Sequence, residues 1–395
     1  MQMEPTTLDQ PELDQAICRL IADIPLAQKA DTARQLLRFP GERTVLEIAE
    51  RNEIVPHLAH VLCAMGETKE LSAIWSDAHE ATQKRISSYL SELDRLAECL
   101  AENGIPLAAL KNGSIARGIY SCIGCCPMGD IDALVSKANF RAAHTILERE
   151  GYQLQSRSIL EGTPDFGQAE AAGGAEYLKI LPDGLEFWFE LQWRPVGGRW
   201  IRPQQEPSAE DLMARSTAIQ GTAARLLAPE DNLLQVTLHV AKHSYVRAPG
   251  LRLHTDVDRI VRAYPCFDWN LFCMRAELLG VKTPVYFSLV IPKLIFETPI
   301  PEAALDRLCP PRWKERLLLM WLRGVGLFNA AERKFSRPGY ILFNALLYDD
   351  LSDLWQAIFP DAAWMRQRFA IRQSWLLPFY HLRRLADLAF RRART

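Results

Sequence analysis

The first quarter of the chain has a helical hydrophobic pattern. From about Leu13 to Gly104, apolar residues recur at spacings of three and four, which is typical of amphipathic helices. The clearest runs are Ile17, Leu20, Ile21 and Ile24, and then Leu90, Leu93, Leu96 and Leu100. We expect the last of these helices to end at Asn103 and Gly104, because glycine favours a helix C-cap and Pro106 cannot continue a helix.

The pattern changes between Pro106 and about Pro195, where short apolar runs bounded by Gly and Pro predict strands. These runs are LAAL (107–110), IDALV (131–135), YLKI (177–180) and LEFWFELQW (185–193). A segment with helical spacing, 136–152, lies between the second and third runs. Strands interrupted by a helix predict a mixed α and β core.

After Pro203 the helical spacing returns and persists nearly to the end. The sequence therefore predicts an α+β fold, with a small mixed sheet flanked by N- and C-terminal helical regions. We place an N-terminal helical region at 1–83, the core at 84–203 and a C-terminal helical domain with a basic tail at 204–395. The 395 residues are 48% hydrophobic and 24% charged with a net charge of −2, which excludes a disordered chain and a globally basic nucleic-acid coat protein.

The cellular location of the protein is predicted from the absence of membrane-spanning and secretory segments. No run of 18 apolar residues occurs, so we expect no transmembrane segment. The acidic N-terminus does not resemble a secretory signal, and the nine cysteines are mostly scattered, as expected of reduced thiols. These features predict a cytoplasmic protein.

The C-terminal tail is an exception to the even charge. Residues 364–395 contain eight arginines against one acidic residue, Asp387, interleaved with aromatic and aliphatic residues. Such a segment can bind a membrane surface, an acidic partner or RNA, which leaves a peripheral membrane location open. The simpler interpretation is a terminal helix that packs its apolar side and exposes its arginines, and nucleic acid is not the expected partner.

Two aspartates give the clearest chemical signal. If IDALV is a strand, Asp130 and Asp132 lie on one face while Ile131 and Ala133 point into a core. Adjacent carboxylates repel each other, and a divalent cation such as Mg²⁺ or Mn²⁺ relieves that repulsion. The pair therefore predicts a metal site, although Asp-x-Asp is a weak motif that recurs at Asp256 and Asp258.

A third acid and a phosphate-binding turn complete the predicted site. Glu190 lies on the same face of its strand as Glu186 and Gln192, and we expect it to be the third metal ligand. Two metals held by three acids can activate a hydroxyl and stabilise a leaving pyrophosphate. Upstream, Gly113 and Ser114 at a helix start would offer donors to a nucleoside triphosphate, and Lys111 would add charge.

These segments together resemble a known family. The order of LKNGSIARGIY, PMGDIDALV, a helix ending in ILEREGY and LEFWFELQW is similar to the uncharacterised nucleotidyltransferase family, which is related to DNA polymerase β. The similarity continues through LAPEDNLLQVTLHVAKH, LRLHTDVDRIV and FDWNLFCMRAELLG, and covers roughly residues 25–390. It implies a polymerase-β-like nucleotidyltransferase core with Asp130 and Asp132 as metal ligands and Lys111 in the family's lysine-glycine position.

The chain departs from the family pattern at three positions. Asn112 separates the lysine from the glycine, Cys126 stands where an arginine usually precedes the proline of PMGDID, and Gln192 replaces the histidine of a His-Trp pair. Arg117, one helical turn from Ser114, is our candidate to replace the missing arginine at the triphosphate.

Two further clusters of possible metal ligands occur in the sequence. Cys122, Cys125 and Cys126 could bind zinc, but a structural zinc site needs four ligands and no second Cys or His pair follows at a suitable spacing, so we expect reduced loop cysteines. His239 and His243 share a helix face, with His254, Asp256 and Asp258 downstream, but no HExxH base accompanies them. Packing histidines are the favoured interpretation, and they could approach the nucleotide cleft.

The functional hypothesis is a metal-dependent nucleotidyltransferase. It would move a nucleoside monophosphate from an NTP to an acceptor hydroxyl or phosphate, releasing pyrophosphate. The resemblance suggests a peptide natural product or a sugar as acceptor, and a protein acceptor is also open. The alternative is a catalytically silent nucleotide-binding or scaffold protein whose basic tail docks on a membrane or partner. Phosphoryl transfer to a peptide or sugar is a second enzymatic alternative.

Overall fold

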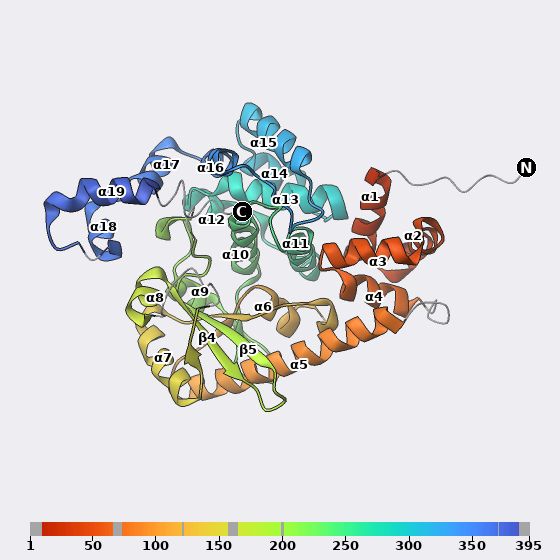
Figure 1. The fold of residues 1–395 in the computed structure, drawn as a ribbon, viewed down its shortest axis with the longest axis horizontal. Helices are drawn as coiled ribbons and strands as arrows, with labels where there is room; N and C mark the ends of the chain where they lie inside the picture. Colours follow the sequence, from red (N-terminus) through yellow and green to blue (C-terminus); the bar gives the residue numbers. More distant parts are fainter. Residues whose placement is uncertain are drawn as a thin grey trace, which may run out of the picture.

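A seven-stranded mixed sheet lies between two groups of helices (Figure 1). The computed structural model describes residues 10–65, 73–120, 122–156, 165–198, 201–369 and 371–386. The strands are β1 (Ala108–Ala109), β2 (Ile131–Leu134), β3 (Gln153–Leu154), β4 (Gly174–Ile180), β5 (Glu186–Gln192), β6 (Thr217–Ala218) and β7 (Arg225–Leu226). Their order is β3-β4-β5-β2-β1-β7-β6, with β2–β5 and β1–β7 parallel and the other pairs antiparallel. The expected α+β class and all four expected strands are confirmed.

Two short strands lie where we expected only helices. β6 and β7 follow Pro203, and β7 pairs in parallel with β1, so the sheet continues to Leu226. Each has only two residues, which is too short to show an alternating pattern in the sequence.

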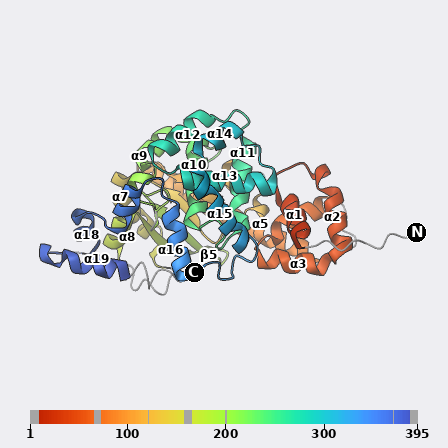
Figure 2. The same ribbon diagram turned by 90° about the horizontal axis from the view of Figure 1, so that it is seen from above.

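The N-terminal helices pack around their own hydrophobic cluster, which includes Ile17, Leu58 and Trp75. These helices are α1 (Gln10–Ile21), α2 (Ala30–Leu36), α3 (Glu42–Arg51), α4 (Val55–Ala64) and α5 (Ala73–Glu102). Both ribbon views show α1 to α4 at one end of the molecule, with the 30-residue α5 running from them along the sheet (Figures 1 and 2). α5 ends as expected, because Gly104 adopts a left-handed φ of 73°.

Helices that connect the strands complete the core. They are α6 (Lys111–Gly118), α7 (Phe140–Arg149), α8 (Phe166–Ala172) and α9 (Ala209–Arg215), with a 3₁₀ turn η4 (Ile123–Cys125) between α6 and β2. α7 confirms the helix expected within 136–152. Its buried residues Phe140, Ala143 and Leu147 follow the spacing seen in the sequence.

The C-terminal half is helical, as expected. Its helices are α10 (Pro229–Lys242), α11 (Leu251–Ala263), α12 (Trp269–Leu278), α13 (Lys282–Phe296), α14 (Glu302–Leu308), α15 (Arg312–Val325), α16 (Arg337–Leu346), α17 (Leu351–Ile358), α18 (Ala362–Phe369) and α19 (Leu377–Ala386). One hydrophobic cluster includes Phe189 of β5, Leu233 of α10 and Phe287 of α13, so the core is continuous across residue 204. The proposed domain boundaries stay predictions.

The apolar segment from Val285 to Phe296 forms most of α13, whose Phe287 and Leu289 are fully buried. Within the described residues, every helix is too short or too polar to cross a bilayer. In the basic tail, Arg383 lies over the rings of Phe369 and Tyr380. Residues 387–395, with three of the tail's arginines, lie outside the described residues.

Candidate functional site

The central strands bring two of the predicted acids together. Asp132 of β2 and Glu190 of β5 are register partners on adjacent parallel strands. Neighbouring strands are about 4.8 Å apart, and partners in register point to the same face of a sheet. Asp132 is only 5% exposed, and Glu190 is half-buried.

Lys111, the first residue of α6, reaches between these two carboxylates. Its Nζ lies 2.5 Å from Asp132 Oδ1 and 3.9 Å from Glu190 Oε2. Burial alone would lower the pKa of Lys111, but the charges of Asp132 and Glu190 more than offset it and raise the pKa above its usual value. Lys111 therefore stays protonated and neutralises part of the acidic cluster.

The site holds more negative than positive charge. Asp130 directly precedes β2, and its charge acts on both Lys111 and Asp132. Burial raises the pKa of Asp132 well above its usual range; Lys111 opposes this effect, and Glu190 and Asp130 raise the pKa further. A further cation would relieve this repulsion.

The oxygen donors of the site fit Mg²⁺ or Mn²⁺. Gln192 Nε2 donates to Asp132 Oδ1 at 2.9 Å, while Gln192 Oε1 is buried and has no hydrogen-bond partner among the described residues. Gly174 on β4 packs closely against these groups, since an added Cβ would lie 3.3 Å from Gln192 Cγ and 3.6 Å from Glu190 Oε1. Carboxylate and amide oxygens are the ligands that these hard cations prefer.

A further acid extends the row and was missed in the sequence. Glu176 of β4 is the antiparallel register partner of Glu190 and is half-buried. Asp132, Glu190 and Glu176 therefore lie in line across three strands. The alternation of the segment now seen as β4 places Glu176 on one face with Gly174 and could have identified it.

Helix α10 presents a polar face towards this part of the core. Asn232, Gln235, His239 and Lys242 are spaced by three and four residues and so share one side of the helix. Gln235 Nε2 donates to Pro195 O at 2.8 Å, and Lys242 Nζ donates to Val196 O at 3.1 Å, just beyond β5.

Lys242 is a cation of the site that the sequence analysis missed. Burial lowers its pKa, Lys111 lowers it further, and Glu190 and Asp132 act in the opposite direction. Burial also lowers the pKa of His239 well below its usual value, with a further effect of Lys111. His239, which we expected could approach the cleft, therefore lies near Lys111. Its imidazole is neutral.

The residues predicted to bind phosphate differ in their positions and in their hydrogen-bond partners. Gly113 is buried in the first turn of α6. Ser114 is fully buried, and its hydroxyl donates to Lys111 O at 2.7 Å, so in this structure it stabilises the turn. Arg117 points to α5, where its Nε lies 3.0 Å from Asp94 Oδ1. Lys111 therefore lies at the carboxylates, whereas Arg117 pairs with Asp94 instead.

A comparison with protein-family models decides the family. The model described as an uncharacterised nucleotidyltransferase matches residues 41–297, well over half of the chain, and the match includes every residue of the site above. This protein belongs to the uncharacterised nucleotidyltransferase family. No curated protein and no solved structure matches the chain.

The structure supplies arginines where this nucleotidyltransferase family member has Cys126. Arg259 of α11 donates to Cys126 Sγ at 3.4 Å and to Cys125 O at 2.9 Å. Arg252, also of α11, donates to Pro127 O at 2.5 Å and pairs with Glu53 at 3.2 Å. Burial lowers its pKa, and Glu53, Asp256 and Asp130 raise it in part. Arg252 therefore places a positive charge at the loop that leads to Asp130.

The Asn112 departure also has a structural partner. In the orientation that satisfies both groups, the Asn112 side chain donates to Asp256 Oδ1 at 2.9 Å. Asp256 lies on α11, between Arg252 and Arg259. The residue that separates Lys111 from Gly113 therefore anchors the start of α6 to the C-terminal helices.

The two other clusters have different outcomes. His239 and His243 pack as a T-shaped pair with ring centroids 4.8 Å apart, while His254 Nε2 bonds to Tyr245 O at 2.9 Å, as expected of packing histidines. For the cysteines, we expected no further metal ligands, because none follow them at a suitable spacing. A histidine pair that precedes them, His60 and His79, lies against Cys122 and Cys125.

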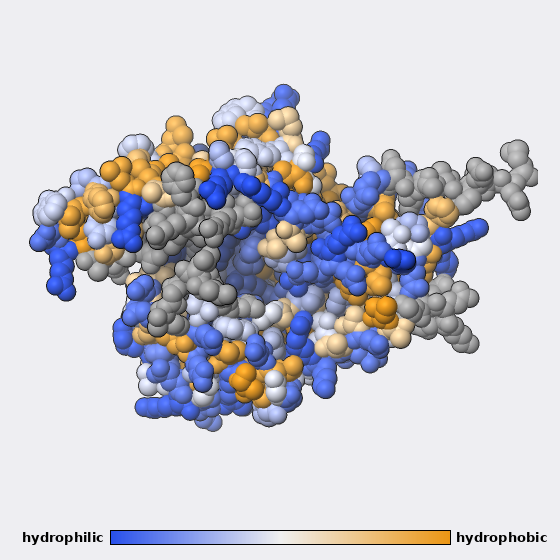
Figure 3. All heavy atoms as spheres, in the orientation of Figure 1, coloured by the Kyte–Doolittle hydropathy of each residue, from blue (hydrophilic) through white to orange (hydrophobic). Residues whose placement is uncertain are grey.

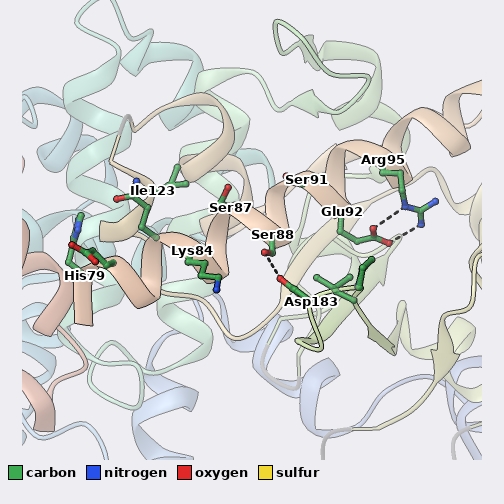
Figure 4. A pocket seen from close by; sticks show the side chains of 13 residues that line it. His79, Lys84, Ser87, Ser88, Ser91, Glu92, Arg95, Ile123 and Asp183 are labelled. Carbon is green, nitrogen blue, oxygen red and sulfur yellow. Dashed lines mark hydrogen bonds and ion pairs between the residues drawn. The ribbon is translucent and has the colours of Figure 1, made fainter. Parts of the chain in front are cut away.

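Figure 3 shows a recessed, mostly hydrophilic area near the middle of the view, where Figure 1 places α6 and α10. A separate groove of about 980 Å³ lies along α5 and is lined by residues such as Ser88, Glu92 and Asp183 (Figure 4). None of the carboxylates of the site lines it, so we do not assign the nucleotide to that groove.

Proposed function

We propose that this protein transfers a nucleoside monophosphate from an NTP to an acceptor hydroxyl or phosphate and releases pyrophosphate, using a polymerase-β-like core. The observation that carries the proposal is the register pairing of Asp132 with Glu190 around the half-buried Lys111. Membership of a nucleotidyltransferase family supports the class of reaction. The acceptor, whether peptide, sugar or protein, is the open part of the proposal.

Three acids would hold the divalent cation. Asp130, Asp132 and Glu190 are the ligands that we assign to Mg²⁺ or Mn²⁺. When bound, such a cation would supply Lewis-acid chemistry for the attacking hydroxyl and the leaving pyrophosphate. Glu190 is only half-buried, so it can orient the acceptor hydroxyl by a hydrogen bond.

The triphosphate would be bound by cations from two helices. Lys111 stands at the first turn of α6, where backbone N–H groups near Gly113 lack partners within the helix. Lys242 of α10 lies close enough to Glu190 and Asp132 to be affected by their charges. Fixed cations and dipoles of this kind stabilise the charge that develops on phosphate oxygens.

Binding of the donor is the first test. Calorimetric titration with ATP, GTP, CTP and UTP, with and without Mg²⁺, should show metal-dependent binding of at least one nucleotide. Asp132→Asn should lose it. Glu186→Gln is the matched control, because Glu186 lies on the same strand and face but is exposed. Absence of binding to the wild-type protein would contradict the proposal.

Labelled nucleotides then identify the bond that breaks. Transfer of label from [α-³²P]NTP to an acceptor, with release of pyrophosphate, is expected of a nucleotidyltransferase. Transfer from the γ-labelled nucleotide would show phosphoryl transfer and would overturn the proposed reaction while leaving the binding site intact.

The silent scaffold has one observation in its favour. Cys126 and Gln192 replace residues that the family pattern uses at the cleft. However, Arg252 provides positive charge near Cys126, and Gln192 hydrogen-bonds to Asp132. The three acids are also retained at a place where their mutual repulsion is costly. Binding without transfer to any acceptor class would favour the scaffold.

A further inference from the structure

Four side chains from three segments converge about the turn that precedes β2. They are His60 of α4, His79 of α5, and Cys122 and Cys125 at η4. One donor atom from each lies within 4.8 Å of the others. Cys125 is buried and the other three are half-buried, so the cluster is at the edge of the core.

Cys122 makes three contacts whose lengths are close to those of a tetrahedral site. Cys122 Sγ lies 3.1 Å from Cys125 Sγ, 3.3 Å from His79 Nε2 and 3.4 Å from His60 Nδ1. Zinc bonds of about 2.3 Å to sulfur and 2.0–2.1 Å to nitrogen place tetrahedral ligands about 3.3–3.8 Å apart. An ion would therefore require the two sulfurs to separate by about 0.7 Å, and donor atoms as far apart as 4.8 Å to approach each other by about 1 Å.

From these contacts we propose that His60, His79, Cys122 and Cys125 bind a structural Zn²⁺ ion. Two thiolates and two imidazoles are the ligand set of a closed, four-coordinate zinc site. The Cys-x-x-Cys spacing lies on a tight turn, and both histidines come from helices that pack against it. This site is distinct from the carboxylates, whose oxygen donors suit a harder cation.

The sequence of the turn is adapted to the approach of His79. A Cβ added at Gly124 would lie 2.6 Å from His79 Nε2, closer than atoms can pack. Glycine at this position therefore allows the imidazole to reach the two sulfurs. Figure 4 shows His79 and Ile123, the residue before Gly124, close together at one end of the groove.

The position of the site suggests what the ion does. It would join α4 and α5 to η4, and η4 leads through Pro127 and Gly129 to Asp130. From the other side, Arg252 and Arg259 bond to the same loop at Pro127, Cys125 and Cys126. The ion would thus fix the loop that presents Asp130, a consequence that rests on the proposed function, whereas binding of zinc itself does not.

Metal content tests the proposal without any assay of activity. The full-length protein, purified under reducing conditions from zinc-supplemented cells, should contain one zinc per chain by mass spectrometry. Cys122→Ser/Cys125→Ser removes two of the four ligands and should contain at most about a tenth of the zinc of the wild-type protein. Cys266→Ser is the control, because Cys266 is exposed and outside the cluster, and it should keep the metal. A zinc-free wild type, or zinc retained by the double variant, would overturn the proposal.

Two further measurements test the proposal even if the double cysteine variant does not fold. Titration of the metal-free wild-type protein with Co²⁺ should give the charge-transfer and visible d–d bands of tetrahedral thiolate coordination, and Zn²⁺ should abolish them.

Gly124→Ala keeps all four ligands but should bind Zn²⁺ more weakly, because the new methyl group displaces His79. Octahedral Co²⁺ spectra, or unchanged affinity in Gly124→Ala, would contradict the proposed geometry. Nucleotide binding is measured separately, so failure of the zinc site and failure of the proposed function are distinguishable.

Discussion

Asp132 and Glu190 are separated by 58 residues in the chain and are direct register partners on the parallel strands β2 and β5. The Nζ of Lys111 lies 2.5 Å from the first carboxylate and 3.9 Å from the second. This arrangement keeps two acids together in the core by means of one cation. It leaves an excess of negative charge, which is the physical basis for a metal site here.

Removing the lysine should destabilise the protein. In Lys111→Met, Asp132 loses its ion-pair partner while it remains buried, and breaking a buried pair in this way costs about 3–5 kcal/mol. We expect urea denaturation to show this loss. Asp132→Asn in the same background should restore much of the stability, because it removes the uncompensated charge.

The same variant also tests the metal site. Mg²⁺ should stabilise Lys111→Met more than the wild-type protein, since the cation would replace the missing charge. An equal effect of Mg²⁺ on both proteins would count against metal binding at Asp132 and Glu190.

Lys242 should contribute to nucleotide binding. In Lys242→Met the charge is lost while the apolar stem is kept, and we expect NTP affinity to fall by roughly tenfold, as for the loss of one charge-assisted hydrogen bond. Calorimetry with the preferred nucleotide measures this change. Lys84→Met, an exposed lysine of α5, is the control and should bind as the wild type does.

Arg117 should affect stability more than nucleotide binding. Its guanidinium pairs with Asp94 across α6 and α5, with side chains 22% and 26% exposed. For Arg117→Gln we expect a loss of about 1 kcal/mol or less in unfolding free energy and no change in NTP affinity. A large loss of NTP affinity would instead support the triphosphate-binding role that the sequence suggested for Arg117.

The pH dependence of stability should depend on Glu92 of α5. Burial would raise the pKa of Glu92, but hydrogen bonds from Arg95, Lys179 and Tyr152 lower it from 4.5 to about 2. Because the folded pKa is below the unfolded one, the stabilisation is fully present above pH 4.5 and is lost as the pH falls towards 2.

The corresponding variant is Glu92→Gln. From the shift of the pKa from 4.5 to about 2 we expect it to be less stable than the wild type by about 3 kcal/mol at pH 7, with the difference shrinking below pH 4.5. Chemical denaturation at several pH values measures this. Glu98→Gln, an exposed position on the same helix, should follow the wild-type curve.

Local periodicity was enough to predict the elements and the core of the acidic site. Strand alternation is strictly local, so it placed Asp132 and Glu190 on defined faces of two strands before any pairing was known. Helical spacing likewise identified α5 and α7. These inferences needed only the periods of regular structure.

Contacts between side chains of different elements depend on how the whole chain folds. His60 and His79 lie 62 and 43 residues before Cys122, and the packing of α4 and α5 against η4 brings them to it. The same holds for Lys242 and Arg252, which reach the site from α10 and α11, and for Arg117, which turns to Asp94 instead. Periodicity fixes the face of a helix, but the neighbour of that face depends on how whole helices pack, and this information is not local in the sequence.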